Sequence, residues 1–177
     1  MQIRPLTGED RGQLGRFFDR VPDADRDFLK EDLDDPGLID RWLSGRRGQW
    51  MLGVEDGGVA GLAGLLPWMG RSAHVGELRL LVDPARRRRG YGRALARAAL
   101  VEAFELGLTH IFVEVGAEQE ALIAMFGALG FEPEALLRDF VRDQGGSSHD
   151  LVMLTHRVEE LWSEMLTLGL GEEQPVR

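Results

Sequence analysis

The chain has 177 residues, of which 44% are apolar and 29% charged, and its formal net charge is −9. This length fits one domain, and the acidity disfavours nucleic acid and anionic lipid as partners. Without cysteine the chain can form no disulfide and no thiolate zinc site, and its four histidines lack metal-ligand spacing, so we expect no metal. It has no signal sequence and no apolar run near the ~20 residues that cross a bilayer, so we expect a cytoplasmic protein.

The N-terminal part is predicted to contain one strand and two helices. Residues 2–6 form the strand, residues 8–20 a helix capped by Thr7, and residues 21–27 a loop. Asp35 and Pro36 begin a second helix that ends near Gly45. Lys30 is the only lysine in the chain, which we interpret as coding bias rather than function.

Strand signals dominate the middle of the chain, and helices return after it. Residues 49–55 and 59–68 form a predicted hairpin, and residues 74–82 a third strand that Asp83 and Pro84 stop. A helix over 90–106, a buried strand over 111–115, a helix over 119–129 and a hairpin of 136–142 with 151–155 follow. This order predicts an α/β fold with a mixed, mostly antiparallel sheet flanked by helices.

The C-terminal end carries an apolar stripe at helical spacing. Its members are Val158, Leu161, Trp162, Met165 and Leu168. We therefore divide the chain into a domain over 1–156 and a helix with a disordered tail over 157–177. The stripe predicts a homodimer, or alternatively a helix docked on the chain's own sheet.

The most informative segment is the arginine- and glycine-rich turn before the helix over 90–106. Glycines let backbone N–H groups approach a ligand at the positive end of the helix dipole, and arginines add donors for phosphate oxygens. The turn therefore predicts a pyrophosphate site. A P-loop would need Lys and Ser/Thr, and a dinucleotide fingerprint would need a third glycine. A nucleic-acid patch and a solvated basic turn are the remaining alternatives.

This segment resembles a known family. Leu80-Leu81-Val82-Asp83-Pro84 followed by Arg87-x-x-Gly90-x-Gly92 is similar to the central motif of the GNAT superfamily of acyl-CoA-dependent N-acetyltransferases, and Ala128-Leu129-Gly130-Phe131 resembles the family's Leu-Gly-Phe ending. The resemblance covers about residues 74–155. It implies a single-domain GNAT-like fold whose splayed central strands form an acyl-CoA cleft. The implied activity is transfer of the acetyl group of acetyl-CoA to a primary amine in a ternary complex.

The resemblance also implies a cofactor site. The residues it assigns to acetyl-CoA are Leu80, Leu81 and Val82 along the pantetheine arm, Arg87, Arg88, Arg89, Gly90, Tyr91, Gly92 and Arg93 at the pyrophosphate, and Gln119 and Phe126. Phe126 is expected beside the thioester, where many members have a tyrosine that protonates the leaving thiolate. Another proton donor or solvent must then protonate the leaving thiolate. The missing tyrosine keeps open an alternative function as a non-catalytic acyl-CoA sensor or partner-binding module.

The general base has two candidates. An acceptor amine with a pKa near ~10 must lose a proton before it attacks, and a carboxylate can accept that proton. Glu77 is the first candidate and Glu114 the second, although Glu77 and Arg79 lie two residues apart and a surface ion pair is an equal interpretation. Acidic residues between 23 and 35 are interpreted as a solvated face, or as the rim of a pocket for a cationic amine.

Overall fold

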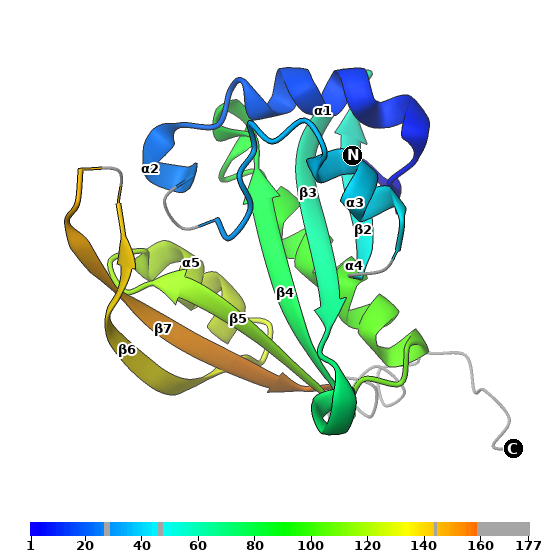
Figure 1. Ribbon diagram of the computed structural model, residues 1–177. Helices are drawn as coiled ribbons and strands as arrows, with labels where there is room; N and C mark the ends of the chain where they lie inside the picture. The colour runs from blue at the N-terminus through cyan, green and yellow to red at the C-terminus, as the bar shows by residue number, and fades with distance from the viewer. Residues whose placement is uncertain (27–28, 46–47, 144, 159–177) are drawn as a thin grey trace, which may run out of the picture.

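The computed structural model describes residues 1–26, 29–45, 48–143 and 145–158, and these form a single α/β domain (Figure 1). The strands are β1 (Gln2–Pro5), β2 (Gln49–Glu55), β3 (Gly58–Pro67), β4 (Val75–Val82), β5 (His110–Gly116), β6 (Glu132–Arg142) and β7 (Ser148–Arg157). The α-helices are α1 (Arg11–Phe18), α2 (Asp23–Arg26), α3 (Leu38–Leu43), α4 (Tyr91–Glu105) and α5 (Glu120–Gly127), and the 3-10 turns are η1 (Gly8–Asp10), η2 (Gly70–Ser72) and η3 (Pro84–Arg86).

The strands form one mixed sheet in the order β1-β2-β3-β4-β5-β7-β6. All neighbouring strands are antiparallel except β4 and β5, which pair in parallel only from Val75 opposite His110 to Glu77 opposite Phe112. Beyond Glu77 the two strands separate, and Figure 1 shows them diverging from a common lower end. The expected mixed sheet with splayed central strands is thereby confirmed.

Two hydrophobic cores cover the two faces of the sheet. Helices α4 and α5 pack on one face, where Leu78, Leu100 and Phe126 are completely or almost completely buried. Helices α1 and α3 cover β2 and β3 on the other face, where the rings of Trp42 and Trp50 stack with centroids 3.9 Å apart. Because these tryptophans are buried in the second core, they stabilise the scaffold by packing.

Three element predictions need correction or have no outcome. The loop expected over 21–27 contains the short helix α2, whose Arg26 side chain donates to the carbonyls of Phe18 (2.8 Å) and Val21 (3.1 Å). The second helix begins at Leu38 rather than at Pro36, because the Asp35 carboxylate accepts from the Gly37 N–H (2.7 Å) in a turn. The segment over 157–177 predicted as a helix with a tail lies outside the described residues, apart from Arg157, which ends β7, and Val158.

The N-terminal strand is joined to η1 by one buried carboxylate. Asp10 is 2% exposed and accepts from Arg4 Nη1 (2.8 Å), from the Thr7 N–H (2.9 Å) and from the Thr7 hydroxyl (2.9 Å). The hydrogen bonds from Arg4 are the main reason why the pKa of Asp10 lies well below its usual range. The expected capping of this turn by Thr7 therefore involves Asp10 as well.

Replacing Asp10 with asparagine should lower the free energy of unfolding by about 1.5–3 kcal/mol at neutral pH, because charge-assisted hydrogen bonds are lost. The depressed pKa stabilises the fold above the ordinary carboxyl pKa of ~3.9, and this stabilisation is lost as the pH falls further. Urea titrations across this range should therefore show the two proteins converging. Asp40→Asn, at an exposed ion pair with Arg11, is the matched control and should have a much smaller effect.

Candidate active site

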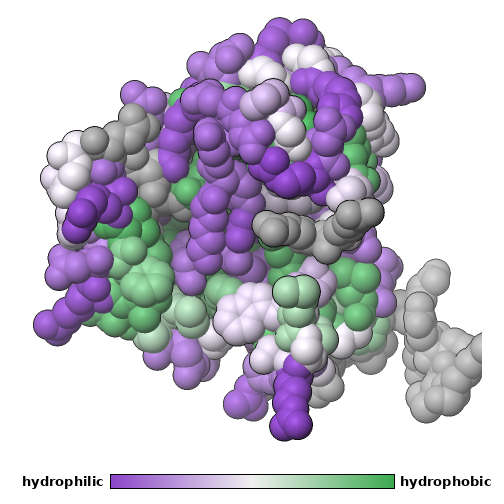
Figure 2. Space-filling view, in the orientation of Figure 1, coloured by the Kyte–Doolittle hydropathy of each residue, from purple (hydrophilic) through white to green (hydrophobic). Residues whose placement is uncertain are grey.

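A cavity of ≈ 250 Å³ lies where β4 and β5 separate. Its walls come from both strands, from Leu122 and Phe126 of α5, from Phe140 and Val141 of β6, and from the segment before α3. Hydrophilic side chains fill the middle of this face of the molecule, with hydrophobic surface below and to the left (Figure 2). The splayed strands thus create a cleft that is apolar on the α5 side and charged at the vertex.

Both predicted base candidates lie at the vertex of this cleft. Glu77 is the last residue of β4 that pairs with β5, and it is 7% exposed. Glu114 follows Phe112, the partner of Glu77, by two positions, so alternation along a strand places both carboxylates on the same face of the sheet. The structure therefore brings Glu77 and Glu114 together in one cavity.

Three further charged side chains surround these carboxylates. The ammonium of Lys30 lies 2.9 Å from Glu77 Oε1 and 2.9 Å from Glu114 Oε2. Arg79 donates from Nε and Nη2 to the two oxygens of Glu77, each at 3.0 Å, and also pairs with Glu31. The ion pair of Glu77 with Arg79 is present, and it lies inside the cavity wall rather than on an open surface.

The electrostatic setting of Glu77 favours a carboxylate that can accept a proton. Burial raises the pKa of Glu77 above its ordinary value, the hydrogen bond and charge of Lys30 oppose this rise, and the negative charge of Glu114 adds to it. A general base works best when its pKa approaches the operating pH. Glu77 thus has the two properties that a base at this position needs, namely access to the cavity and a raised pKa.

The arginine- and glycine-rich turn joins β4 to the N-terminus of α4. Gly90 is the N-cap of α4 and has a φ of +81°, a conformation that is unstrained only for glycine. A Cβ on Gly92 would lie 3.5 Å from Val82 and 3.6 Å from Leu80, so this glycine adjoins side chains of the C-terminal half of β4. The helix N-terminus and the end of β4 therefore form one continuous surface.

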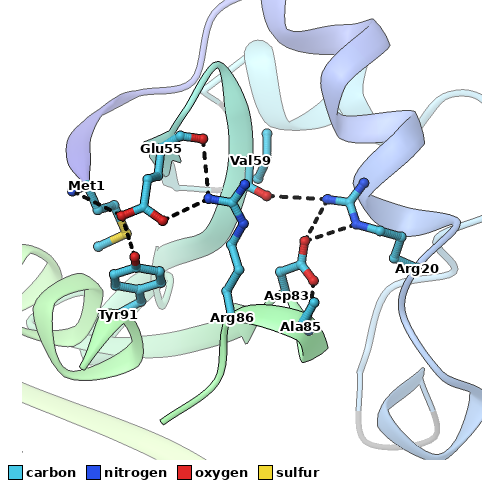
Figure 3. Close-up of polar contacts among 8 residues, drawn as sticks. All are labelled: Met1, Arg20, Glu55, Val59, Asp83, Ala85, Arg86 and Tyr91. Atoms are coloured by element: carbon cyan, nitrogen blue, oxygen red, sulfur yellow. Dashed lines mark hydrogen bonds and ion pairs between the residues drawn. The ribbon is translucent and has the colours of Figure 1, made fainter. Parts of the chain in front are cut away.

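Two carboxylates fix the start of this turn (Figure 3). Asp83 is buried and accepts from the Ala85 N–H (3.0 Å) and from Arg20 Nε (2.9 Å), so it connects the turn to the segment that follows α1. Arg20 also donates to the Val59 carbonyl of β3 (3.3 Å). Through Arg20, the Asp83-Pro84 pair at the end of β4 is therefore connected both to the segment after α1 and to β3.

Glu55, at the tip of the β2–β3 hairpin, is the second carboxylate that holds the turn in place. It accepts from Arg86 Nη1 (2.9 Å) and from the Tyr91 hydroxyl, and it lies 3.8 Å from the N-terminal ammonium of Met1. Figure 3 shows Arg86 and Tyr91 converging on this carboxylate from the two ends of the turn. The Tyr91 hydroxyl therefore connects the start of α4 to the β2–β3 hairpin.

The other residues predicted for the cofactor lie at two places. Arg87 pairs with Asp25 of α2, whereas Arg88, Arg89 and Arg93 have exposed side chains at or near the start of α4. Leu80 borders the cavity. The side chain of Leu81 is instead buried in the core on the opposite face, so Leu81 could meet a ligand in the cleft only through its backbone.

Two predicted residues on the α5 side have structural contacts of their own. The Gln119 side-chain oxygen accepts from the Gly116 N–H (3.1 Å) and so closes the turn between β5 and α5. Phe126 is completely buried, packs edge-on against Phe131 with ring centroids 5.0 Å apart, and borders the cavity. The apolar wall of the cleft is therefore built on the core itself.

Sequence reasoning misses Lys30 as a site residue. Its only signal is rarity, because it is the single lysine of the chain, and it lies within the acidic segment that is interpreted above as a solvated face or as the rim of a pocket. Two acids of that segment, Asp25 and Glu31, also pair with arginines of the turn and of β4. Among the described residues no group of histidine and acidic side chains has a metal-binding arrangement, and no helix is long and apolar enough to cross a membrane.

Comparisons with known proteins agree with this architecture. A family model for the acetyltransferase (GNAT) family matches residues 16–131. The uncharacterized N-acetyltransferase YjgM of Escherichia coli K12 is 28% identical over 136 residues, which are 73% of this chain and 81% of that protein. A ribosomal protein bS18-alanine N-acetyltransferase of the same strain is 31% identical over 74 residues, 42% of this chain and half of that protein.

Solved structures give the same result at the level of the fold. The ribosomal-protein-alanine N-acetyltransferase of Brucella melitensis superposes with a TM-score of 0.77 at 25% identity, over 89% of this chain and 99% of that chain. The acetyltransferase yncA of Salmonella typhimurium, solved with its cofactor acetyl-CoA, has a TM-score of 0.77 at 19% identity, over 90% and 94% of the two chains.

Proposed function

The chain belongs to the acetyltransferase (GNAT) family, and on that premise we propose that it acetylates a primary amine with acetyl-CoA by direct attack at the vertex of the cleft. The activity is thus that of an acyltransferase. The observation that carries the proposal is the cavity at which β4 and β5 separate, with Glu77 and Glu114 in its wall and β4 leading from it to the glycine turn.

The cofactor is proposed to lie along β4. The N-terminus of α4, with Gly90, Gly92 and the exposed arginines beside it, suits the pyrophosphate, because backbone N–H groups and the helix dipole both favour an anion there. From this turn, β4 runs back past Leu80 to Glu77. A pantetheine arm that follows the strand would bring the thioester to the vertex of the cleft.

The chemistry at the vertex follows from the groups that surround it. Glu77 is proposed to take a proton from the ammonium of the acceptor, directly or through water, with Glu114 as the second candidate. The neutral amine then attacks the thioester carbonyl, the carbon–sulfur bond breaks, and the thiolate leaves, while the second proton lost by nitrogen passes to solvent or to the thiolate. Phe126 cannot supply a proton, but a thiol of pKa near ~8.5 is a tolerable leaving group and solvent can protonate it.

The acceptor is proposed to be a cationic primary amine. The three carboxylates at the vertex, Glu77, Glu114 and Glu31, outnumber the cations Lys30 and Arg79, and this excess negative charge attracts an ammonium group before it is deprotonated. Small amines and protein amines both fit this chemistry, and two of the relatives are named for a ribosomal protein substrate. A cytoplasmic location suits an enzyme that consumes acetyl-CoA. The homodimer stays a prediction, because residues 159–177 lie outside the described residues.

Incubation with acetyl-CoA and a mixed panel of primary amines should release free CoA with sustained turnover, measured with a thiol reagent. Amines with an additional positive charge should be the better substrates, because the vertex is acidic. A control without amine sets the hydrolysis background. Tight binding of acetyl-CoA without turnover on any amine would support the alternative, a non-catalytic acyl-CoA-binding module, and would contradict the proposed enzyme.

A further inference from the structure

Lys30 places a primary amine inside the candidate active site. Its ammonium lies 2.9 Å from Glu77 and 2.9 Å from Glu114, and its side chain borders the same cavity as both carboxylates. The side chain is 43% exposed, so the nitrogen is held by ion pairs but is not sealed inside the core. No other lysine exists in the chain.

The position of this nitrogen matches the requirements of an acceptor. An acceptor amine must lie next to the base and near the point at which β4 and β5 separate, and Lys30 Nζ satisfies both conditions. A lysine side chain carries the same functional group as the proposed substrates. We propose that Lys30 is an acetyl acceptor in cis, so that the enzyme acetylates its own active-site lysine. This inference rests on the proposed function.

The step balances with acetyl-CoA as the only co-reactant. The Lys30 ammonium gives a proton to the Glu77 carboxylate, and the nitrogen lone pair forms a bond to the thioester carbonyl carbon. The carbon–sulfur bond then breaks, CoA leaves as the thiolate, and the second proton lost by nitrogen passes to solvent or to the thiolate. The products are Nε-acetyllysine at position 30 and free CoA, with no change in oxidation state.

Acetylation would alter the site that performs it. The acetylated side chain is neutral, so its ion pairs with Glu77 and Glu114 are lost. Two carboxylates that were compensated by an internal cation would then face the cavity with only Arg79 nearby. An external cationic amine would be attracted more strongly to the acetylated enzyme than to the unacetylated one.

A single lysine makes the proposal easy to test by peptide mapping. Trypsin cleaves the unacetylated chain after Arg26, Lys30 and Arg41, whereas acetylation of Lys30 removes one cleavage and leaves the fragment 27–41 intact. We expect this fragment to accumulate to near stoichiometry after incubation with acetyl-CoA, at a first-order rate that does not change when the enzyme is diluted. Intact-mass measurements count acetyl groups and detect any modification of the N-terminal amine.

Three controls separate self-acetylation from other sources of the product. Lys30→Arg should gain no acetyl group apart from any at the N-terminus. Glu77→Gln should acetylate Lys30 at least about tenfold more slowly, because the proposed base is missing. The urea-unfolded chain gives the rate of purely chemical acetylation, which should also be slower.

The outcomes distinguish this inference from the proposed function when the amine panel is run on the same preparation. Turnover of external amines without modification of Lys30 overturns the inference and leaves the proposed function standing. A rate that rises with enzyme concentration, or that equals the rate of the unfolded chain, also overturns acetylation in cis. If neither external amines nor Lys30 are acetylated while acetyl-CoA binds, both the inference and the proposed function are wrong.

Discussion

Replacement of Glu77 by glutamine is expected to lower kcat by about 10²–10⁴-fold while acetyl-CoA still binds, because the variant keeps the size of the side chain and loses its ability to accept a proton. Glu77 lies at the last position of β4 that pairs with β5, in contact with Lys30 and Arg79, and glutamine has the same bulk as the glutamate that it replaces there. Steady-state kinetics with the best amine of the panel, together with calorimetric titration of acetyl-CoA, measure the two quantities separately.

The pH profile is a second readout for Glu77. Burial and the charge of Glu114 raise its pKa, with Lys30 acting in the opposite direction, so kcat of the wild type should fall as the pH drops through a value above the ordinary ~4.3 of glutamate. The Glu77→Gln variant should lack this acidic limb. The matched control is Glu114→Gln, which removes the other carboxylate beside Lys30.

These variants decide between the two base candidates. A large loss in Glu77→Gln with a small loss in Glu114→Gln supports Glu77 as the base. The reverse pattern would assign the role to Glu114 and reduce Glu77 to an ion-pair partner of Arg79. Unchanged kcat in both variants would contradict a carboxylate base at the vertex altogether.

Gly90→Val is expected to weaken acetyl-CoA binding by at least about tenfold. Gly90 caps α4 with a φ of +81°, and a β-branched residue in this left-handed region is strained by about 1–3 kcal/mol. Apart from the two neighbouring residues of the chain, no atom lies within 4 Å of the position that a Cβ would take, so the Cβ itself meets open space. The substitution should therefore distort the backbone of the turn and fill part of the space that the pyrophosphate is proposed to occupy.

Gly107→Val provides a matched control at the other end of the same helix. Gly107 has a φ of +70°, and again no atom lies within 4 Å of the position that its Cβ would take, so the strain is similar, but the residue is remote from the turn. Both variants should lose comparable stability in urea titrations, and only Gly90→Val should lose affinity in calorimetry. Equal affinity in the two variants would contradict the assignment of the pyrophosphate to this turn.

The parts of the fold that can be predicted from sequence are those that short-range chemistry specifies. Asp83 and Pro84 end β4 where expected, and Gly90 begins α4 within one residue of the predicted start, because a proline or a left-handed glycine imposes a local conformation in any context. The pairing of Glu77 with Arg79 is accessible to sequence reasoning for the same reason. Alternation along a strand predicts that Glu77 and Arg79 lie on the same face of the sheet, but it does not predict which other side chains surround them.

The parts of the candidate site that sequence reasoning does not predict depend on contacts between segments that are distant in the sequence. Lys30 reaches Glu77 and Glu114 from a loop that carries no periodic pattern, so neither spacing nor composition indicates that it enters the cleft. The same holds for Arg20 and Glu55, which hold the turn from other elements. Such contacts arise from the packing of α1, α2 and the β2–β3 hairpin around the end of β4, which a linear pattern does not encode.

The short pairing of β4 with β5 also affects how the domain opens. In the described residues the strand pairing between the half-sheet β1-β2-β3-β4 and the half-sheet β5-β7-β6 covers three residue pairs, from Val75 to Glu77 on β4. Because the backbone pairing between the half-sheets is this short, we expect the amide hydrogens of these residues to exchange with solvent through local separation of the strands more readily than through global unfolding. We expect a ligand that contacts both half-sheets to slow this exchange, because it binds only the state in which the two strands are paired.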